Sequence, residues 1–244
     1  MRIQEHVNRI NQGVEAWNEF DDAFAKYLDI NKDEEGFYCF DQTQFNTRLG
    51  ENVSFKGAKF CCEVSFNESK FSRIVFDRAK FSDRVSFNSA KFHGKAYFEN
   101  AKFESASFFE LAEFDNDAEF KGATFNGHAG FNFASFSMHA NFMSASFNTE
   151  AHFIEATFSG FVHFKDASFS KYAGFQNSCF SGRASFFRAK FDGGVYFVNV
   201  KSKSLFDLRN VTAKNSVPAF AGIDYKIPPI IDGLSVPPPN NKSN

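Results

Sequence analysis

The sequence predicts an all-β solenoid, a chain that winds into a rod of short stacked coils. Three observations predict this fold: an excess of phenylalanine, a regular spacing of the phenylalanines, and turn-forming residues between them. The 244 residues include 38 Phe but only 1 Trp and 6 Tyr. One side chain that recurs in this way indicates one structural position repeated many times. The length is within reach of a single domain.

The phenylalanine spacing predicts very short strands. From Phe81 to Phe197 the gaps between successive repeat phenylalanines alternate between 6 and 5, so the period is 11. A small residue, usually Ala, stands two positions before most of them. Residues two apart face the same side of an extended segment, and the residue between them is mostly polar. Each Phe is therefore expected to point inward beside a small neighbour.

The residues between the predicted strands are typical of turns. Ser, Asn, Asp or His follows alternate phenylalanines and is often followed by Gly, as in His93-Gly94 and Asn126-Gly127. Gly supplies positive φ in tight turns, and short polar side chains bond their own backbone. A corner at every fifth or sixth position is too frequent for helices or hairpins. We therefore expect coils around a narrow axis, each hydrogen-bonded to the next.

The repeating unit AxFxx, as in AKFHGKAYFEN and ASFNTEAHFIE, resembles that of the pentapeptide-repeat family. The family's usual unit is A(D/N)LXX, so Phe stands here in the central Leu position. The resemblance covers roughly residues 40–200 and implies a right-handed quadrilateral β-helix with four faces per coil. The usual unit is a strict five, whereas the alternation of 5 and 6 predicts about 22 residues per coil, with longer corners at two opposite edges. One residue is missing between Phe71 and Phe81, which predicts one shortened corner.

Residues separated by one full coil should then stack in four inward columns. Burial of each ring stabilises the fold by roughly 1.5–3 kcal/mol relative to exposure, and Ala beside Phe leaves room for four inward rings. The first column is Phe81, Phe103, Phe125, Phe147, Phe169 and Phe191, and the second is Phe87, Phe109, Phe131, Phe153, Phe175 and Phe197. The third is Phe92, Phe114, Phe136, Phe158 and Phe180, and the fourth is Phe98, Phe120, Phe142, Phe164 and Phe186.

Three segments follow from this pattern: residues 1–35, residues 36–211 and residues 212–244. In the first, apolar residues from Val7 to Leu28 recur every three or four positions, which predicts a helix. We expect this helix to cap the first coil, and binding of a partner is the alternative. The second segment is the repeat coil with its caps. The third contains all six prolines and is expected to be irregular, either disordered or weakly docked on the coil, with binding of a partner as the alternative.

The sequence offers no pattern for catalysis or for a cofactor. No nucleotide-binding, zinc-protease or nucleophile-elbow motif is present. His128 and His139 are separated by half a predicted coil, so they should lie on opposite sides and cannot share a metal. We therefore expect no catalytic, cofactor or metal site. The four cysteines lack CxxC spacing and are expected to be free thiols. Without a long apolar segment at either end, the chain is expected to be cytoplasmic.

Charge separates two functional hypotheses. Some members of the pentapeptide-repeat family resemble B-form DNA in shape and negative charge, and they protect DNA gyrase by occupying its DNA site. Residues 52–200 contain 16 Lys and Arg against 15 Asp and Glu, and none of these residues occurs from Asn126 to Thr149. A near-neutral rod fits such mimicry poorly. The main hypothesis is a non-catalytic, bacterial-type scaffold that binds a protein, with no nucleic-acid or membrane partner, and the alternative is a DNA mimic acting on a type II topoisomerase.

Apolar residues at outward positions mark the expected contact surface. On the second face these are Phe108, Ile154, Tyr196 and Val198, and on the fourth face they are Tyr97, Met143 and Phe187. Tyr196 and Val198 lie near the C-terminal end of the coil. There they are expected to receive the tail, with a homodimer contact through the same end as the alternative.

Overall fold

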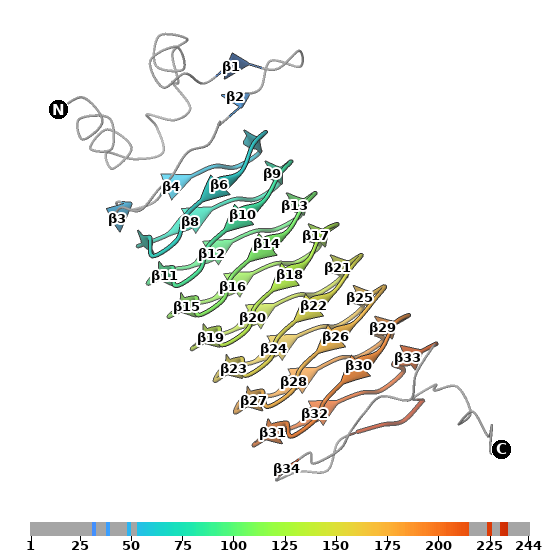
Figure 1. The fold of residues 1–244 in the computed structure, drawn as a ribbon. Helices are drawn as coiled ribbons and strands as arrows, with labels where there is room; N and C mark the ends of the chain where they lie inside the picture. The colour runs from blue at the N-terminus through green and yellow to red at the C-terminus, as the bar shows by residue number, and fades with distance from the viewer. Residues whose placement is uncertain are drawn as a thin grey trace.

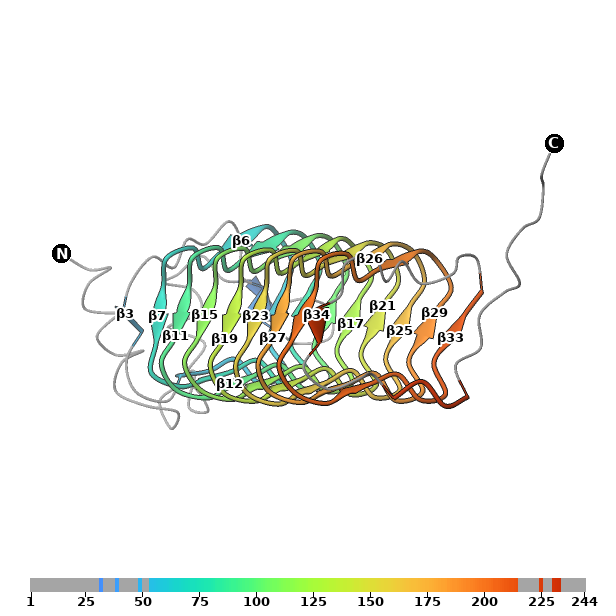
Figure 2. The same cartoon turned by 90° about the horizontal axis from the view of Figure 1, so that it is seen from below.

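The computed structural model describes residues 53–214 as a continuous rod, together with the short stretches 31–32, 38–39, 48–49, 224–225 and 230–233 (Figure 1). The chain winds around one axis, and successive coils lie side by side along the rod (Figure 2). Every regular element in the described residues is a strand of two residues. The helix predicted within residues 1–35 lies outside the described residues. The described part of the chain contains no helix that could cross a membrane.

The strands form four sheets, which are the four faces of the coil. The first face, sheet A, contains β1 (Asn31–Lys32), β2 (Tyr38–Cys39), β5 (Lys59–Phe60), β9 (Lys80–Phe81), β13 (Lys102–Phe103), β17 (Thr124–Phe125), β21 (Ser146–Phe147), β25 (Ser168–Phe169), β29 (Lys190–Phe191) and β33 (Thr212–Ala213). The second face, sheet B, contains β6 (Val64–Ser65), β10 (Val85–Ser86), β14 (Ser107–Phe108), β18 (Ala129–Gly130), β22 (Ala151–His152), β26 (Ala173–Gly174) and β30 (Val195–Tyr196).

The remaining two faces lie opposite these. The third face, sheet C, contains β3 (Arg48–Leu49), β7 (Lys70–Phe71), β11 (Lys91–Phe92), β15 (Glu113–Phe114), β19 (Ser135–Phe136), β23 (Thr157–Phe158), β27 (Cys179–Phe180), β31 (Lys201–Ser202) and β34 (Asp224–Tyr225). The fourth face, sheet D, contains β4 (Val53–Ser54), β8 (Ile74–Val75), β12 (Ala96–Tyr97), β16 (Ala118–Glu119), β20 (Ala140–Asn141), β24 (Val162–His163), β28 (Ala184–Ser185) and β32 (Phe206–Asp207).

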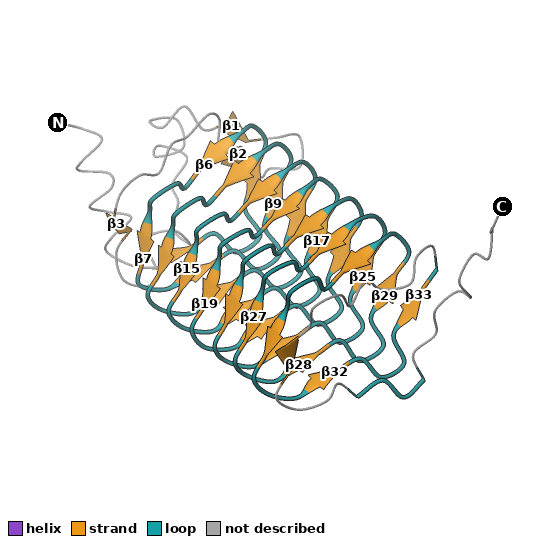
Figure 3. Ribbon diagram, turned by 60° about the horizontal axis from the view of Figure 1, so that its bottom comes forward, coloured by secondary structure: helices purple, strands orange, loops and turns teal. Residues whose placement is uncertain are grey.

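The strand pairing confirms the four-sided coil and its predicted register. Phe103 pairs in parallel with Phe81 on one side and with Phe125 on the other, so its partners are the phenylalanines one full coil before and after it. Strands of the same face therefore align in straight rows along the rod (Figure 3). The register repeats because two short and two long units return the chain to the same face in the same orientation.

The shortened corner lies between β7 and β8. Lys70 pairs with Lys91, whereas Ile74 pairs with Ala96, so the offset between partners rises by one from the first pair to the second. The missing residue therefore falls between Phe71 and Ile74. Pairing of the sheets continues on both sides of this corner, so a single deletion is absorbed locally.

The interior consists of stacked phenylalanine rings. Phe103 stacks on Phe81 and Phe125 with ring centroids 5.0 and 4.7 Å apart, close to the spacing of about 4.8 Å between neighbouring strands. Rings of the second and fourth columns meet edge to face at the centre. Phe120, for example, lies 5.5 Å from both Phe109 and Phe131. All phenylalanines of the four columns, from Phe81 to Phe197, are buried.

The small residues beside the rings are equally buried. Ala79, Ala101 and Ala123 on the first face are fully inaccessible, as are Ala129 and Ala151 on the second. Since rings from four sides converge on the axis, a longer side chain at these positions would overlap them. This requirement explains why Ala predominates beside Phe along the chain, with Val at some positions such as Val85 and Val162.

The short corners, which follow the second and fourth columns, hold the positive backbone angles. The amide of Ala79 donates to the carbonyl of Phe76, and Arg78 between them has φ 57°, the pattern of a type II turn. The equivalent position in other coils is occupied mostly by non-Gly residues, such as Leu111 and Phe133. Each donates its amide to the next coil, as Arg78 does to the Glu99 carbonyl at 2.8 Å, which helps to hold this unfavourable conformation.

The glycines of the long corners serve another purpose, so the expectation of positive φ at these glycines is wrong. Gly94 and Gly127 are not among the residues with positive φ. A Cβ at Gly127 would lie 2.3 Å from the Ser105 backbone carbon, and one at Gly94 would overlap the Ser72 carbonyl oxygen. These glycines therefore allow neighbouring coils to approach closely. The sequence shows that Gly occupies a corner, but the reason depends on the coil packed beside it.

Described parts of the C-terminal segment continue the coil. β34 pairs in parallel with β31, with Asp224 opposite Lys201. Leu208 donates its amide to the Ile230 carbonyl at 2.7 Å, and Asn210 donates to the Asp232 carbonyl at 2.9 Å. These bonds cover backbone groups that the ends of sheets C and D would otherwise expose. The stretches 224–225 and 230–233 thus dock on the coil, within the segment that was expected to be irregular.

The cysteines do not all match the sequence prediction. Cys61 is disulfide-bonded, so the expectation of free thiols is wrong for this residue, while the thiol of Cys179 is free as expected. Spacing along the sequence excludes local redox and zinc motifs, but a disulfide joins residues that only the fold brings together. The expected cytoplasmic location rested partly on free thiols and stays a prediction.

Candidate contact surface on the fourth face

The outward side chains of sheet D form a grid with three columns. Residues of one column occupy successive coils, because they follow the register of the strands beneath them. The corner column contains His139, Phe161 and Arg183; the strand column contains Asn141, His163, Ser185 and Asp207; the column after the inward Phe contains Met143, Lys165, Phe187 and Arg209.

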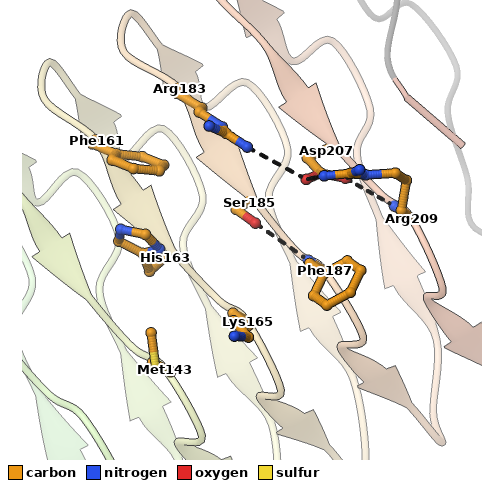
Figure 4. Close-up of a pocket in the computed structure, with 9 residues that line it drawn as sticks. All are labelled: Met143, Phe161, His163, Lys165, Arg183, Ser185, Phe187, Asp207 and Arg209. Carbon is orange, nitrogen blue, oxygen red and sulfur yellow. Dashed lines mark hydrogen bonds and ion pairs between the residues drawn. The ribbon is translucent and has the colours of Figure 1, made fainter.

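Near the C-terminal end this grid is hollowed around Ser185. The hollow has a volume of about 410 Å³. Ser185 is short and buried, whereas the residues around it in the grid are longer, so their side chains form the rim. Figure 4 shows the lining residues: Met143, Phe161, His163, Lys165, Arg183, Ser185, Phe187, Asp207 and Arg209.

Cations lie against the two phenylalanine rings of the rim. The Arg183 guanidinium carbon is 5.4 Å from the centroid of Phe161. Around Phe187 the corresponding distances are 5.6 Å for Arg209 and 5.9 Å for Lys165 Nζ. A guanidinium that stacks on a ring still presents its N–H edge to a ligand. The rim therefore combines apolar surface with available hydrogen-bond donors.

Asp207 holds the two arginines of the rim in place. Its side chain is 1% exposed and accepts a bidentate pair of hydrogen bonds from Arg209, at 2.9 and 2.8 Å. Arg183 lies 3.7 Å from the same carboxylate. The hydrogen bonds from Arg209 lower the pKa of Asp207 below its usual value, so the carboxylate is ionised at neutral pH.

The hollow carries an excess of positive charge. Its lining includes three cations, Lys165, Arg183 and Arg209, against the single carboxylate of Asp207. Burial, assisted by the nearby charge of Arg183, lowers the pKa of His163, so this imidazole is neutral at pH 7. The ring of His163 instead packs on Phe161, with centroids 3.9 Å apart. The site suits a ligand that is both anionic and partly apolar.

The residues of the predicted contact surface do not form one patch. Met143 and Phe187 line the hollow, whereas Tyr97 lies further toward the N-terminal end with Arg73 5.1 Å above its ring. On the second face Phe108, Ile154 and Val198 are half-buried, and Tyr196 is 37% exposed. Selection of apolar residues alone missed the basic part of the hollow and Phe161. Writing the outward positions in columns one coil apart would have brought these residues together.

The second face carries a different feature, a ladder of rings along the rod. Arg84 lies 5.9 Å from the ring of Phe108, and Phe108 lies 5.7 Å from His128. The ladder continues from His128 to His152 at 4.8 Å, to Tyr172 at 5.1 Å and to Tyr196 at 5.0 Å. Its members come alternately from corners and from strands, which makes the ladder invisible in a linear reading of the sequence.

Two glycines make room for this ladder. A Cβ at Gly174 would lie 2.7 Å from the Tyr172 ring, and one at Gly130 would lie 3.3 Å from His128 Nε2. The rings of Tyr172 and His128 therefore fold over a strand position that has no side chain. The outward strand positions alternate accordingly between large residues and Gly: Phe108, Gly130, His152, Gly174 and Tyr196.

Comparison with known proteins agrees with the repeat seen in the structure. Residues 87–135 match the family model described as pentapeptide repeats (9 copies). No curated protein matches the chain. The matched residues lie within the coil, and parallel pairing of strands one coil apart continues beyond them on both sides, from β4 to β33. The chain is thus a repeat protein, and its matched part is similar to the pentapeptide-repeat family in a Phe-centred form with a 5 + 6 double unit.

Proposed function

We propose that the chain is a non-catalytic scaffold that binds a protein partner, with the hollow around Ser185 as the central contact site. The observation that carries this proposal is the combination of Phe161 and Phe187 with three cations around one depression. Aromatic residues and Arg dominate the binding energy of protein interfaces when they border a pocket. The remainder of the rod supports them as a regular, hydrogen-bonded frame.

The chemistry of the hollow favours one kind of partner. Its excess positive charge favours carboxylates, and its rings favour an apolar or aromatic side chain beside them. A volume of about 410 Å³ accommodates one or two side chains. The partner is therefore expected to present a short acidic segment with an aromatic or aliphatic anchor.

The rigidity of the site supports this function. Arg183 and Arg209 are held by Asp207, and β28 between them pairs with β24 on one side and with β32 on the other. Side chains that are ordered before binding lose less conformational entropy when a partner docks. A rod with fixed outward positions suits recognition of an extended segment.

The alternative, DNA mimicry toward a type II topoisomerase such as DNA gyrase, is less well supported. Mimicry requires phosphate-like negative charge along the rod, whereas the hollow is positive and the band from Asn126 to Thr149 carries no Asp, Glu, Lys or Arg. A supercoiling assay separates the two functions, since inhibition or drug protection of gyrase at micromolar protein would favour mimicry. A homodimer through the C-terminal end also stays a prediction.

Affinity capture from the native host, with matched variants, tests the scaffold proposal. The test variant combines Lys165→Glu with Phe187→Ala and removes one cation of the hollow together with the ring that Lys165 and Arg209 contact. The control combines Arg84→Glu with Phe108→Ala and removes a similar pair, also 5.9 Å apart, from the second face. We expect one host protein to be retained by the wild type and the control but lost from the test variant. Equal retention by both variants, or none by the wild type, would contradict the proposal.

A further inference from the structure

Two histidines and a glutamate meet on the second face. His128 lies in the corner before β18, and Glu150 occupies the equivalent corner one coil later. His152 points outward from β22, two positions after Glu150. One ligand atom from each of these side chains lies within 4.8 Å of the other two, and His152 Nε2 is 3.7 Å from a Glu150 carboxylate oxygen.

Glu110 supplies a second observation at the same place. Its Oε2 atom is buried and has no hydrogen-bond partner among the described residues. Its Oε1 atom and His128 Nε2 lie 2.0 and 3.3 Å from the position that a Cβ of Gly130 would occupy. A partly buried carboxylate therefore faces the His128 ring across a space that Gly130 leaves open. A buried oxygen of this kind is unfavourable unless a further group or ion satisfies it.

We propose that His128, Glu150 and His152 bind a divalent transition-metal ion, of which zinc is the expected one. Two imidazole nitrogens and one carboxylate oxygen are a typical donor set for zinc, which leaves a fourth position open. Zinc holds its ligands at about 2.0–2.2 Å. The three side chains therefore have to draw together from the present spacing of up to 4.8 Å through small rotations.

The surroundings favour a cation at this position. The stretch from Asn126 to Thr149 contains no Lys or Arg, and Glu110 adds a second carboxylate beside His128. The Glu150 side chain is 59% exposed and that of His152 is 24% exposed, so the ion would lie at the surface. Its open position would face solvent, where water or a side chain of another protein completes the coordination. The ion would also link two neighbouring coils.

The sequence analysis compared histidines separated by half a coil, and this spacing does not bring the three ligands together. His128 and His139 do lie on different faces, as expected, since they precede β18 in sheet B and β20 in sheet D. The relevant spacing is instead one full coil between His128 and Glu150, and two positions more between His128 and His152. Residues separated by a full coil are neighbours, whereas residues separated by half a coil are not.

Zinc binding by the full-length chain tests the proposal, measured by isothermal titration calorimetry and by the visible spectrum with Co²⁺. We expect the wild type to bind one ion at this site and the His128→Gln/His152→Gln variant to bind it more than about 100-fold more weakly. The matched control is His139→Gln/His163→Gln, which removes two histidines from the fourth face and should leave the affinity unchanged.

Glu150→Gln provides an independent variant, because this exposed side chain contributes nothing to the core. We expect it to weaken zinc binding by at least about tenfold without a change in the urea midpoint of the metal-free protein. The proposal is overturned if the wild type binds no zinc, or if both the His128→Gln/His152→Gln and the Glu150→Gln variants bind it as the wild type does. The latter result would assign the ion to other ligands, such as the thiol of Cys179.

Discussion

The inside and the outside of the coil share one register but differ in what they specify. Inward positions carry the same few residues throughout, Phe beside a residue that is mostly Ala, and they are buried along the whole described rod. Outward positions vary, and two small residues among them, Ser185 and Gly130, create the two candidate sites. The interior therefore determines where each outward side chain stands, and the local choice of outward residues determines what the surface binds.

The largest expected effect contrasts Phe136 with Phe133, three positions away. Phe136 is buried and stacks on Phe114 and Phe158 at 4.7 and 4.9 Å. We expect Phe136→Ala to lower the free energy of unfolding by about 3–5 kcal/mol, because the rings above and below cannot close the cavity. Phe133 is 51% exposed, so Phe133→Ala should change the free energy of unfolding by less than about 0.5 kcal/mol. Urea unfolding measures both variants. Similar losses of free energy of unfolding would contradict the assignment of Phe136 as inward and Phe133 as outward.

A smaller effect separates the two kinds of corner. A Cβ at Gly160 would lie 2.2 Å from the Met138 carbonyl oxygen, so Gly160→Ala has to force two coils apart. We expect a loss of about 1–3 kcal/mol, as for other overpacked sites. Leu111 is the control, because it already has φ 58° in a short corner. Leu111→Gly relieves backbone strain but increases the conformational entropy of the unfolded chain. These two effects oppose each other, so the free energy of unfolding should change by no more than about 0.5 kcal/mol. Urea unfolding measures both variants. A larger decrease in the urea midpoint for Leu111→Gly than for Gly160→Ala would show that the two kinds of corner are assigned wrongly.

The smallest expected effect concerns the buried carboxylate beneath the hollow. Asp207→Asn should lower the free energy of unfolding by about 1–2 kcal/mol at pH 7, because Asp207 accepts charged hydrogen bonds from Arg209. The folded-state pKa of Asp207 is lowered, so this contribution is present above the unfolded value of about 3.9 and is lost as the pH falls through the folded pKa. The difference in urea midpoint between wild type and variant should therefore be smaller at pH 3 than at pH 5 and 7. A constant difference across this range would contradict the assignment.

Prediction from the sequence succeeded where one residue type repeats in one environment. The alternation of 5 and 6 led to the four columns, the register and the shortened corner after Phe71, all of which depend only on order along the chain. It failed for the long-corner glycines and for Cys61, since Gly127 faces the Ser105 backbone of the preceding coil and a disulfide requires a partner brought close by folding. The sequence singled out Met143 and Phe187, which line the hollow, but it did not predict the hollow itself.

The sequence by itself determined the fold of the rod, because a period of 11 with two inward rings allows few ways to bury every ring and pair every strand. Tertiary structure decided which outward residues become neighbours across coils. Arg183 and Asp207 are distant in sequence, as are His128 and His152, and each pair is in contact only because its members lie on successive turns of the coil. Side-chain length then decides the rest: a short Ser185 leaves a depression between long neighbours, and Gly130 leaves a space that His128 and Glu110 share.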